Sequence, residues 1–246
     1  MSIHYPRVAI TSLWRNDEKR DLWKRARHLT SKTYGRLRWI WIVGDSDDNT
    51  YPALLDYASV EGYLIGQDIQ IIEHRTGIVG DSHRSRLGRL SGSHDLAFQQ
   101  LRPDDDYVLQ HESDLVSAPD VVERLLATGH DCVAGLTWLG DLFYDVWGFR
   151  AKGKRFSNTP PYHEVYRPDA PFEVESFGSC WLVPALPFVG SDRIRITAGA
   201  AREACAKLRE RGYSLWADPT VRVEQPRHLW EAHDLTEEQV DEEYWR

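Results

Sequence analysis

Two short apolar runs near the start of the chain, with a helical segment between them, most constrain its fold. Residues 7–13 and 38–43 are rich in aliphatic and aromatic side chains, as strands buried on both faces are. Residues 18–29 carry an apolar stripe at helical spacing, and Asn16 and Asp17 can cap that helix. A strand, a helix and a strand at this spacing predict a parallel sheet with a right-handed crossover. Such a sheet places its ligands beyond the carboxyl ends of its strands.

The same alternation continues along the chain. We predict further strands at 70–74, 107–109, 131–138, 172–183 and 220–223, and helices at 51–60, 82–101, 119–129 and 200–211. Residues 139–172 break the pattern with glycines, prolines and aromatics, as functional loops often do. Residues 229–246 form an acidic tail with helical character. The 246 residues therefore predict a single α/β domain with a central, mostly parallel sheet flanked by helices.

Charge and cysteine content narrow the class of protein. The net charge of −8 argues against a surface that binds nucleic acid throughout, but the basic run over residues 150–155 allows a local patch. The three cysteines show neither a disulfide framework nor zinc-ligand spacing, which favours a reducing compartment. The sequence shows no signal peptide and no apolar run of membrane-spanning length. A cytoplasmic location is the expectation.

The segment 104–116 concentrates acidic side chains around a predicted strand. Its strand portion, 107–109, leads to Glu112 and Asp114, which strand alternation would place on one face with Ser113 on the other. Two carboxylates on one face repel each other unless a cation lies between them. A hard divalent cation accepts two such oxygens and fills its other positions with water or phosphate. A solvated acidic loop is the alternative.

Polar residues also follow the first two predicted strands. Thr11, Arg15, Asp45 and Asp47 fall at or near the carboxyl ends, where a ligand is expected. Asp45 can contact the ligand, or it can hold backbone groups of its own turn.

Three arginines lie near the start of the predicted helix 82–101, which Ser82 can cap. Arg84, Arg86 and Arg89 are unusual there, because a helix N-terminus disfavours cations. A bound anion would remove the objection, since helix N-termini and arginines both bind phosphate. A solvated basic face is the alternative.

The run 107–116, together with Pro119 and the helix after it, resembles the metal-binding core of GT-A-fold glycosyltransferases. It looks most like the mannan-polymerase type and related bacterial and viral enzymes. The resemblance implies that Glu112 and Asp114 hold Mn²⁺ or Mg²⁺ against a nucleotide-sugar diphosphate, with UDP or GDP as the nucleotide. Glu112 stands where many members have the first Asp, and Gln110-His111 stands where an acidic or apolar pair is more usual.

Other site residues follow from the same resemblance. It implies a donor contact for Asp45 and adds weight to those of Arg84 and Arg86. Thr11, Arg15 and His111 complete the predicted donor-binding residues. Trp147 and Arg150 are the predicted acceptor-binding residues, and Asp145 and Glu175 are the predicted catalytic residues. Residues 143–150 are similar to a Tyr-Asp-x-Trp segment near the acceptor, although a hairpin with buried aromatics also fits them. Residues 174–178 are similar to a Val-Asp-Ser-Val-Gly segment beside the sugar. Family members place a metal-binding histidine after the last strand, where Gln225 lies nearest and His228 is the better ligand.

These features predict a metal-dependent glycosyltransferase that moves a sugar from a nucleotide-sugar to a hydroxyl group. The acceptor can be a glycan, a small molecule or a hydroxymethylated DNA base. The region 197–201 lacks the acidic pair of many inverting relatives, which favours retention of configuration. Two alternatives remain: a degenerate GT-A domain that binds sugar or nucleic acid, and a nucleotidyltransferase, whose glycine-rich phosphate loop is missing here.

Overall fold

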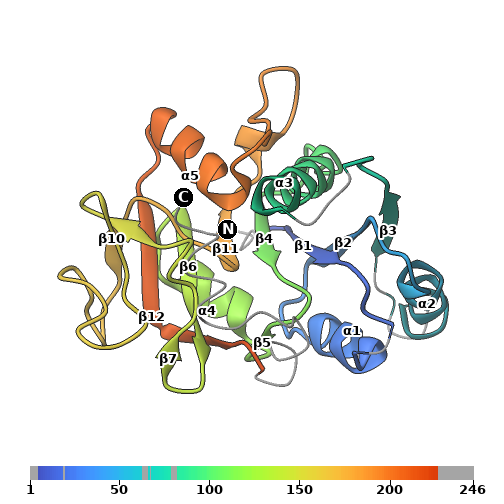
Figure 1. The fold of residues 1–246 in the computed structure, drawn as a ribbon, viewed down its shortest axis with the longest axis horizontal. Helices are drawn as coiled ribbons and strands as arrows, with labels where there is room; N and C mark the ends of the chain where they lie inside the picture. The colour runs from blue at the N-terminus through green and yellow to red at the C-terminus, as the bar shows by residue number, and fades with distance from the viewer. Residues whose placement is uncertain (1–4, 19, 63–65, 67, 79–81, 227–246) are drawn as a thin grey trace.

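The computed structural model of the chain describes residues 5–18, 20–62, 66, 68–78 and 82–226, which form a curled sheet with helices on both faces (Figure 1). From edge to edge the strands are β10 (Phe172–Val174), β12 (Leu215–Glu224), β6 (Cys132–Leu139), β11 (Cys180–Pro184), β4 (Tyr107–His111), β1 (Val8–Trp14), β2 (Leu37–Gly44) and β3 (Ile69–His74). The helices are α1 (Leu22–Thr30), α2 (Thr50–Tyr57), α3 (His83–Gln99), α4 (Val121–Ala127) and α5 (Ala200–Glu210), with a π-helical turn at Ala58–Gly62 and a 3₁₀ turn at Leu186–Phe188.

The shorter strands lie beside this main path. β5 (Val116–Ser117) pairs with β12, and β7 (Leu142–Phe143) pairs with β6. β8 (Arg150–Ala151) and β9 (Lys154–Arg155) form a separate hairpin. The predicted loop region 139–172 therefore contains three of these short strands.

The direction of the strands confirms the predicted α/β sheet. β3, β2, β1 and β4 run parallel, β11 runs antiparallel between β4 and β6, and β6 and β12 run parallel to each other. The strand predicted over 172–183, with a glycine break, is two separate strands: β10 lies at the edge of the sheet, β11 lies in its centre, and Gly178 lies between them. The last strand begins at Leu215 rather than at residue 220. A bulge between Asp218 and Arg222 accommodates Pro219, which lacks a backbone N–H for the ladder.

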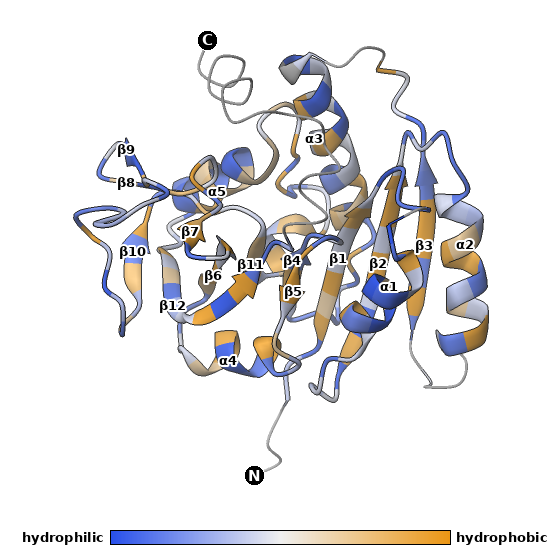
Figure 2. Ribbon diagram, turned by 60° about the horizontal axis from the view of Figure 1, so that its bottom comes forward, coloured by the Kyte–Doolittle hydropathy of each residue, from blue (hydrophilic) through white to orange (hydrophobic). Residues whose placement is uncertain are grey.

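Two apolar cores lie on opposite faces of the sheet because side chains alternate along each strand. In β2, Trp39 and Trp41 belong to the core under α1, α2 and α4, whereas Ile40 and Ile42 belong to the core under α3 and α5. Figure 1 shows α3 and α5 above the sheet and α1 and α4 below it. Figure 2 shows the hydrophobic residues concentrated along the central strands, while the β8–β9 hairpin is largely hydrophilic.

The first helix begins four residues later than predicted, at Leu22. Asn16 and Asp17 do not cap it, because tertiary contacts occupy both side chains. Asn16 accepts a hydrogen bond from the backbone N–H of Asp47, and Asp17 forms an ion pair with Arg25 at 2.7 Å. By contrast, the predicted cap of α3 is confirmed: Ser82 Oγ accepts a hydrogen bond from the backbone N–H of Ser85.

The acidic residues 104–106 before β4 have structural roles and lie at the opposite end of that strand from Glu112. Asp105 and Arg38 form a buried ion pair at 2.5 Å, with both side chains fully buried, and Asp106 accepts a hydrogen bond from the backbone N–H of Arg7. Among the described residues, no helix is both long and apolar enough to cross a membrane. The predicted metal ligand His228 and the acidic tail at 229–246 lie outside the described residues.

Candidate functional site

The two carboxylates of the predicted metal motif lie in a tight turn at the end of β4. The strand ends at His111, and the backbone N–H of Leu115 donates to the carbonyl of Glu112 at 3.3 Å. Strand alternation is therefore the wrong reason for their proximity, although the turn still exposes Glu112 and Asp114 in part and buries Ser113. Arg25 fixes this turn from behind: its Nε donates to the carbonyl of Ser113 at 2.9 Å, and its Nη2 donates to Ser113 Oγ at 2.8 Å.

The electrostatics of the turn confirm that its carboxylates repel one another. Burial, followed by the charges of Asp114 and Asp145, raises the pKa of Glu112 to about 8, although Arg86 acts in the opposite direction. Burial and the same carboxylates raise the pKa of Tyr144 well above its ordinary value. A cation at this site would offset the repulsion.

The side-chain amide of Gln225 lies next to Asp114. β5 follows the acidic turn and pairs with the end of β12, which places Gln225 close to Asp114. Its Nε2 donates to Asp114 Oδ2 at 3.3 Å, and its Oε1 is buried without a hydrogen-bond partner in the described part of the chain. A buried amide oxygen without a partner costs free energy, which a cation would recover. The described residues contain no group of three or more His, Cys, Asp or Glu side chains placed to hold a metal ion, so a cation here would rely on two carboxylates, this amide and its own ligands.

Asp145 lies buried beside Glu112 and connects two distant segments. Its Oδ2 accepts a hydrogen bond from the backbone N–H of Ser179 at 2.6 Å, and the carbonyl of Ser179 accepts one from the backbone N–H of Glu112 at 3.2 Å. A Cβ atom at Gly178 would lie 2.0 Å from Asp145 Oδ2, so only glycine fits there. Burial raises the pKa of Asp145 even though hydrogen bonds from Ser179 and Gly148 oppose the shift. The predicted catalytic Asp145 therefore lies close enough to Glu112 to affect its pKa, as Asp114 does.

The predicted donor residues divide into two groups. Arg15 and Asp45 meet at the carboxyl ends of β1 and β2, where Arg15 Nε donates to the carbonyl of Asp45 at 3.4 Å. Both carboxylate oxygens of Asp45 hold Thr76, through its backbone N–H at 2.9 Å and its hydroxyl at 2.6 Å. Asp45 thus holds the segment after β3 rather than the backbone of its own turn, and its predicted donor contact stays a prediction. Thr11 is fully buried within β1 and donates to Gln110 Oε1 at 2.5 Å, contrary to the predicted donor contact.

His111 is also a structural residue rather than the predicted donor contact. It is fully buried, its Nδ1 lies 2.9 Å from the carbonyl of Glu112, and its Nε2 lies 2.8 Å from Ser117 Oγ. Burial, together with the charge of Lys32, lowers the pKa of His111 to about 3, so the ring is neutral. Both ring nitrogens are occupied, which leaves none for a ligand.

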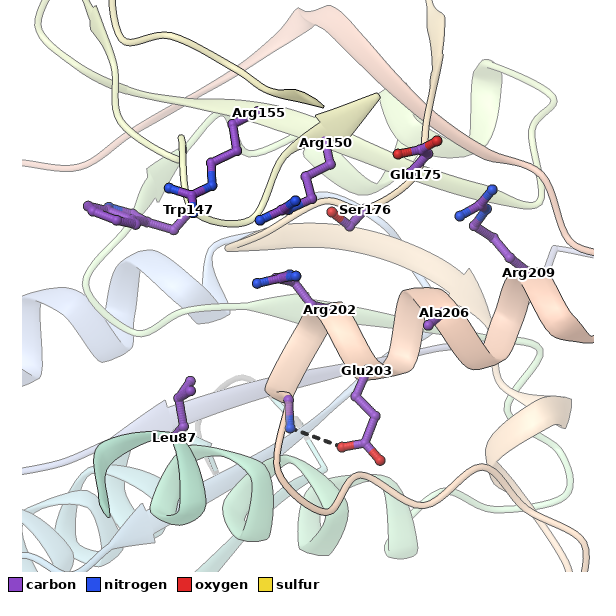
Figure 3. A pocket seen from close by; sticks show the side chains of 11 residues that line it. Leu87, Trp147, Arg150, Arg155, Glu175, Ser176, Arg202, Glu203, Ala206 and Arg209 are labelled. Atoms are coloured by element: carbon purple, nitrogen blue, oxygen red, sulfur yellow. Dashed lines mark hydrogen bonds between the residues drawn. The ribbon is translucent and has the colours of Figure 1, made fainter. Parts of the chain in front are cut away.

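The remaining predicted residues lie at the start of α3 and around a pocket. Arg84 and Arg86 both have exposed side chains at the start of α3, and Arg86 lies close enough to affect the pKa of Glu112. The pocket has a volume of ≈ 530 Å³ and is lined by Leu87, Trp147, Arg150, Arg155, Glu175, Ser176, Gly199, Arg202, Glu203, Ala206 and Arg209 (Figure 3). The structure therefore brings together the predicted acceptor residues Trp147 and Arg150 with the predicted catalytic Glu175.

Sequence reasoning missed two arginines of this pocket, Arg202 and Arg209. One signal was available: Arg202 lies in the first turn of α5, where a cation is as unusual as Arg84 and Arg86 are in α3. It also missed Arg25, whose role depends on a contact 88 positions away in sequence.

No family model and no curated protein matches the sequence. Solved structures do match the fold. The chain is similar to GalNAc-T7 in complex with UDP, GalNAc and Mn²⁺, with a TM-score of 0.60 and 15% identity over 90% of this chain and 44% of that one. It is also similar to the mannosyltransferase PcManGT from Pyrobaculum calidifontis in complex with GDP-Man and Mn²⁺, with a TM-score of 0.55 and 13% identity over 90% of this chain and 57% of that one. The chain thus spans about half the length of these proteins, and its fold is the GT-A-like fold of glycosyltransferases.

Proposed function

We propose that this protein is a metal-dependent glycosyltransferase that uses a nucleotide-sugar donor with UDP or GDP as the nucleotide. One observation carries the proposal: two mutually repelling carboxylates, Glu112 and Asp114, lie in one turn beyond the end of β4, beside the side-chain amide of Gln225, whose buried Oε1 has no hydrogen-bond partner among the described residues. The fold supports it, because the two similar structures contain Mn²⁺ together with UDP or GDP-Man. Gln225, the nearer of the two residues considered after the last strand, is the one that we propose beside the carboxylates; His228 lies outside the described residues, so its role as a metal ligand stays a prediction.

The residues of this site fit Mn²⁺ or Mg²⁺ and a diphosphate. Glu112, Asp114 and the Oε1 of Gln225 supply hard oxygen ligands, as either ion prefers. The cation, when bound, offsets the negative charge that develops on the leaving diphosphate. Arg86 lies beside the acidic turn and can share that charge, as can Arg84 from the same helix start.

In the transfer, the bond between the anomeric carbon and the diphosphate oxygen breaks, and its electron pair stays on the diphosphate. The acceptor oxygen forms the new bond to the anomeric carbon and loses its proton. Glu175 faces the pocket and is the carboxylate that we place beside the sugar and the acceptor hydroxyl. Glu203 is unsuited to act as a base: burial raises its pKa, but Lys207 and three backbone N–H groups lower it well below its ordinary value. The lack of a second free carboxylate there supports retention of configuration.

Metal-dependent binding of a nucleoside diphosphate tests the proposal. Asp114→Ala should weaken the Mn²⁺-dependent binding of UDP or GDP by more than about 100-fold, because even outer-shell partners of metal ligands are worth about 10- to 100-fold. Asp141→Ala removes an exposed carboxylate elsewhere and should bind like the wild type. Isothermal titration with and without Mn²⁺ measures both variants. Equal Mn²⁺-dependent affinity in Asp114→Ala and the wild type would reject the metal site.

Turnover then separates an enzyme from a binding module. The wild type should release nucleoside diphosphate from its donor sugar only when Mn²⁺ or Mg²⁺ is present. Binding without release under any acceptor condition would favour a degenerate sugar-binding domain, and release of pyrophosphate from a nucleoside triphosphate would favour a nucleotidyltransferase.

A further inference from the structure

The pocket beside α5 has an unusual concentration of positive charge for a chain with a net charge of −8. Four arginines line it: Arg150 and Arg155 from the β8–β9 hairpin, and Arg202 and Arg209 from α5. Figure 3 shows Arg150 and Arg155 extending from the hairpin, with Arg155 next to Trp147, and Arg202 extending toward Arg150 from α5. The hairpin and the helix are far apart in sequence, so the fold itself assembles this group.

Three of these arginines repel one another. Burial, followed by the charges of Arg150 and Arg202, lowers the pKa of Arg155, and burial followed by the charge of Arg150 lowers the pKa of Arg202. Among the described residues, neither Arg150 nor Arg202 forms an ion pair with a carboxylate. The Nε of Arg150 is buried without a hydrogen-bond acceptor in the same described part of the chain. An anion in the pocket would relieve the repulsion and supply that acceptor.

The two glutamates of the pocket do not neutralise this group. Glu203 points away from it, toward the start of its own helix (Figure 3), where it accepts hydrogen bonds from the backbone of Thr197, Ala198 and Gly199 and pairs with Lys207. Glu175 lies near Arg209 in Figure 3, apart from the three clustered arginines, and its Oε2 accepts from the backbone N–H of Gly153. Neither glutamate therefore neutralises Arg150 or Arg202.

The chemistry of the cluster selects a phosphate among anions. A phosphomonoester carries about −1.5 to −2 charges at pH 7 and three acceptor oxygens, which suits three guanidinium groups better than a carboxylate does. The volume of ≈ 530 Å³ is that of a site for a small molecule. A nucleic acid needs a basic surface that follows several phosphates, and the net charge of −8 opposes such a surface.

We propose that this pocket binds the phosphate group of a small phosphorylated acceptor. Its role as an acceptor site rests on the proposed glycosyl transfer. Glu175 lines the same pocket on the side of Arg209, so an acceptor that extends from the cluster toward Arg209 would place its hydroxyl near Glu175. In the transfer, the hydroxyl oxygen of this molecule bonds to the anomeric carbon and its proton passes to an oxygen of the leaving diphosphate, which keeps the electron pair of the broken bond. The acceptor phosphate is unchanged.

Phosphate binding without metal or donor tests this site independently of catalysis. Isothermal titration of inorganic phosphate into the full chain, in EDTA and at low ionic strength, should show binding at one site. Arg202→Ala and Arg150→Ala should each weaken it by about 10- to 100-fold, as expected for loss of a charged hydrogen bond. Arg195→Ala removes an exposed arginine outside the pocket and should bind phosphate like the wild type.

Three results would overturn the proposal. Unchanged phosphate affinity in both Arg202→Ala and Arg150→Ala would remove the pocket as the site. Competition of phosphate by UDP or GDP with Mn²⁺, lost in Asp114→Ala, would place the phosphate in the donor site. Tight, strongly salt-dependent binding of duplex DNA without binding of inorganic phosphate would indicate a nucleic-acid surface instead. If phosphate binds as expected but no nucleotide-sugar is turned over, the proposed function fails while the anion site stands.

Discussion

The acidic turn after β4 and the arginine pocket beside α5 both contain several side chains of the same charge. They differ in how far buried side chains hold those charged groups in place. Two buried cations hold the acidic turn in place. Arg25 is 8% exposed and donates two hydrogen bonds to Ser113. Lys32 is also 8% exposed and donates to Ser117 Oγ at 3.0 Å, just beyond the turn. The arginines instead extend from a hairpin and an outer helix face, where Arg202 and Arg209 are exposed. The two regions therefore differ in how far their geometry is fixed before a ligand arrives.

This difference has a chemical reason. A small divalent cation requires oxygens at nearly fixed distances, so its ligands need a rigid second layer of contacts. A phosphate group can be reached by long guanidinium side chains from several directions, so its site can depend on charge more than on rigid placement. We expect substitutions behind the acidic turn to change stability and affinity together, and substitutions in the arginine pocket to change mainly affinity.

The largest effect should come from removing the support of the acidic turn. Arg25→Ala leaves Asp17 without its buried partner and should lower the free energy of unfolding by about 3 kcal/mol. It should also weaken Mn²⁺-dependent binding of nucleoside diphosphate, because Ser113 no longer fixes the turn between Glu112 and Asp114. Chemical denaturation and titration measure the two effects.

Two variants of the same helix sharpen this result. Lys24→Ala removes an exposed cation and should change stability by less than about 0.5 kcal/mol. Arg25→Lys keeps the charge opposite Asp17 but not the two bonds to Ser113, so it should recover part of the stability and little of the affinity. Normal Mn²⁺-dependent binding of nucleoside diphosphate in Arg25→Ala would contradict the inference that the hydrogen bonds from Arg25 to Ser113 position Glu112 and Asp114.

The pH dependence of metal binding is the next largest effect. The pKa of Glu112 is raised from 4.5 to about 8, and a cation binds its deprotonated form. Affinity for Mn²⁺ should therefore rise by up to about tenfold per pH unit below pH 8 and then level off. Titration at several pH values, in buffers of different ionisation enthalpy, counts the protons released.

The same raised pKa predicts that the stability of the metal-free protein falls with pH, whereas the affinity for Mn²⁺ rises. Because the folded-state pKa of Glu112 exceeds the unfolded value, the metal-free protein should lose stability as the pH rises from about 4.5 to 8. Glu112→Gln should remove both this loss and the pH dependence of Mn²⁺ binding. A pH-independent Mn²⁺ affinity in the wild type would contradict a Glu112 ligand with a raised pKa.

The smallest effect should be a slight gain of stability in the arginine pocket. Without phosphate, Arg202→Ala should raise the free energy of unfolding by a few tenths of a kcal/mol at low salt, since it removes a repelling, exposed cation from the first turn of α5. Arg202→Lys keeps the charge and should show no gain. Added salt should reduce the difference, and added phosphate should reverse it by stabilising the wild type. A loss of stability in Arg202→Ala would contradict repulsion within the pocket.

The sheet was predictable because its strands are apolar on both faces, a property that local sequence records. The start of α3 was also predictable, since the Ser82 cap involves neighbouring residues. The start of α1 was not, because Asn16 and Asp17 look like caps but bind Asp47 and Arg25 instead. Local signals fail where a side chain capable of capping finds a better partner from another segment.

The candidate site was predictable to the same extent. Glu112 and Asp114 are two residues apart, so any compact turn keeps them together even though the predicted strand geometry was wrong. Thr11 and His111 were misplaced because burial of their polar atoms depends on Gln110 and Ser117 in the folded sheet. The arginine pocket joins residues about 50 positions apart, and no spacing rule connects Arg150 with Arg202.

The pairing of β5 with the end of β12 also affects how the protein is made. Asp114 and Gln225 are 111 positions apart, so during synthesis the acidic turn leaves the ribosome long before its amide partner. A chain that has been made only as far as α5 has both carboxylates but not the third oxygen. At the proposed metal site, a cation that requires all three would bind the finished sheet in preference to every earlier intermediate, so the supply of metal would influence the yield of folded protein.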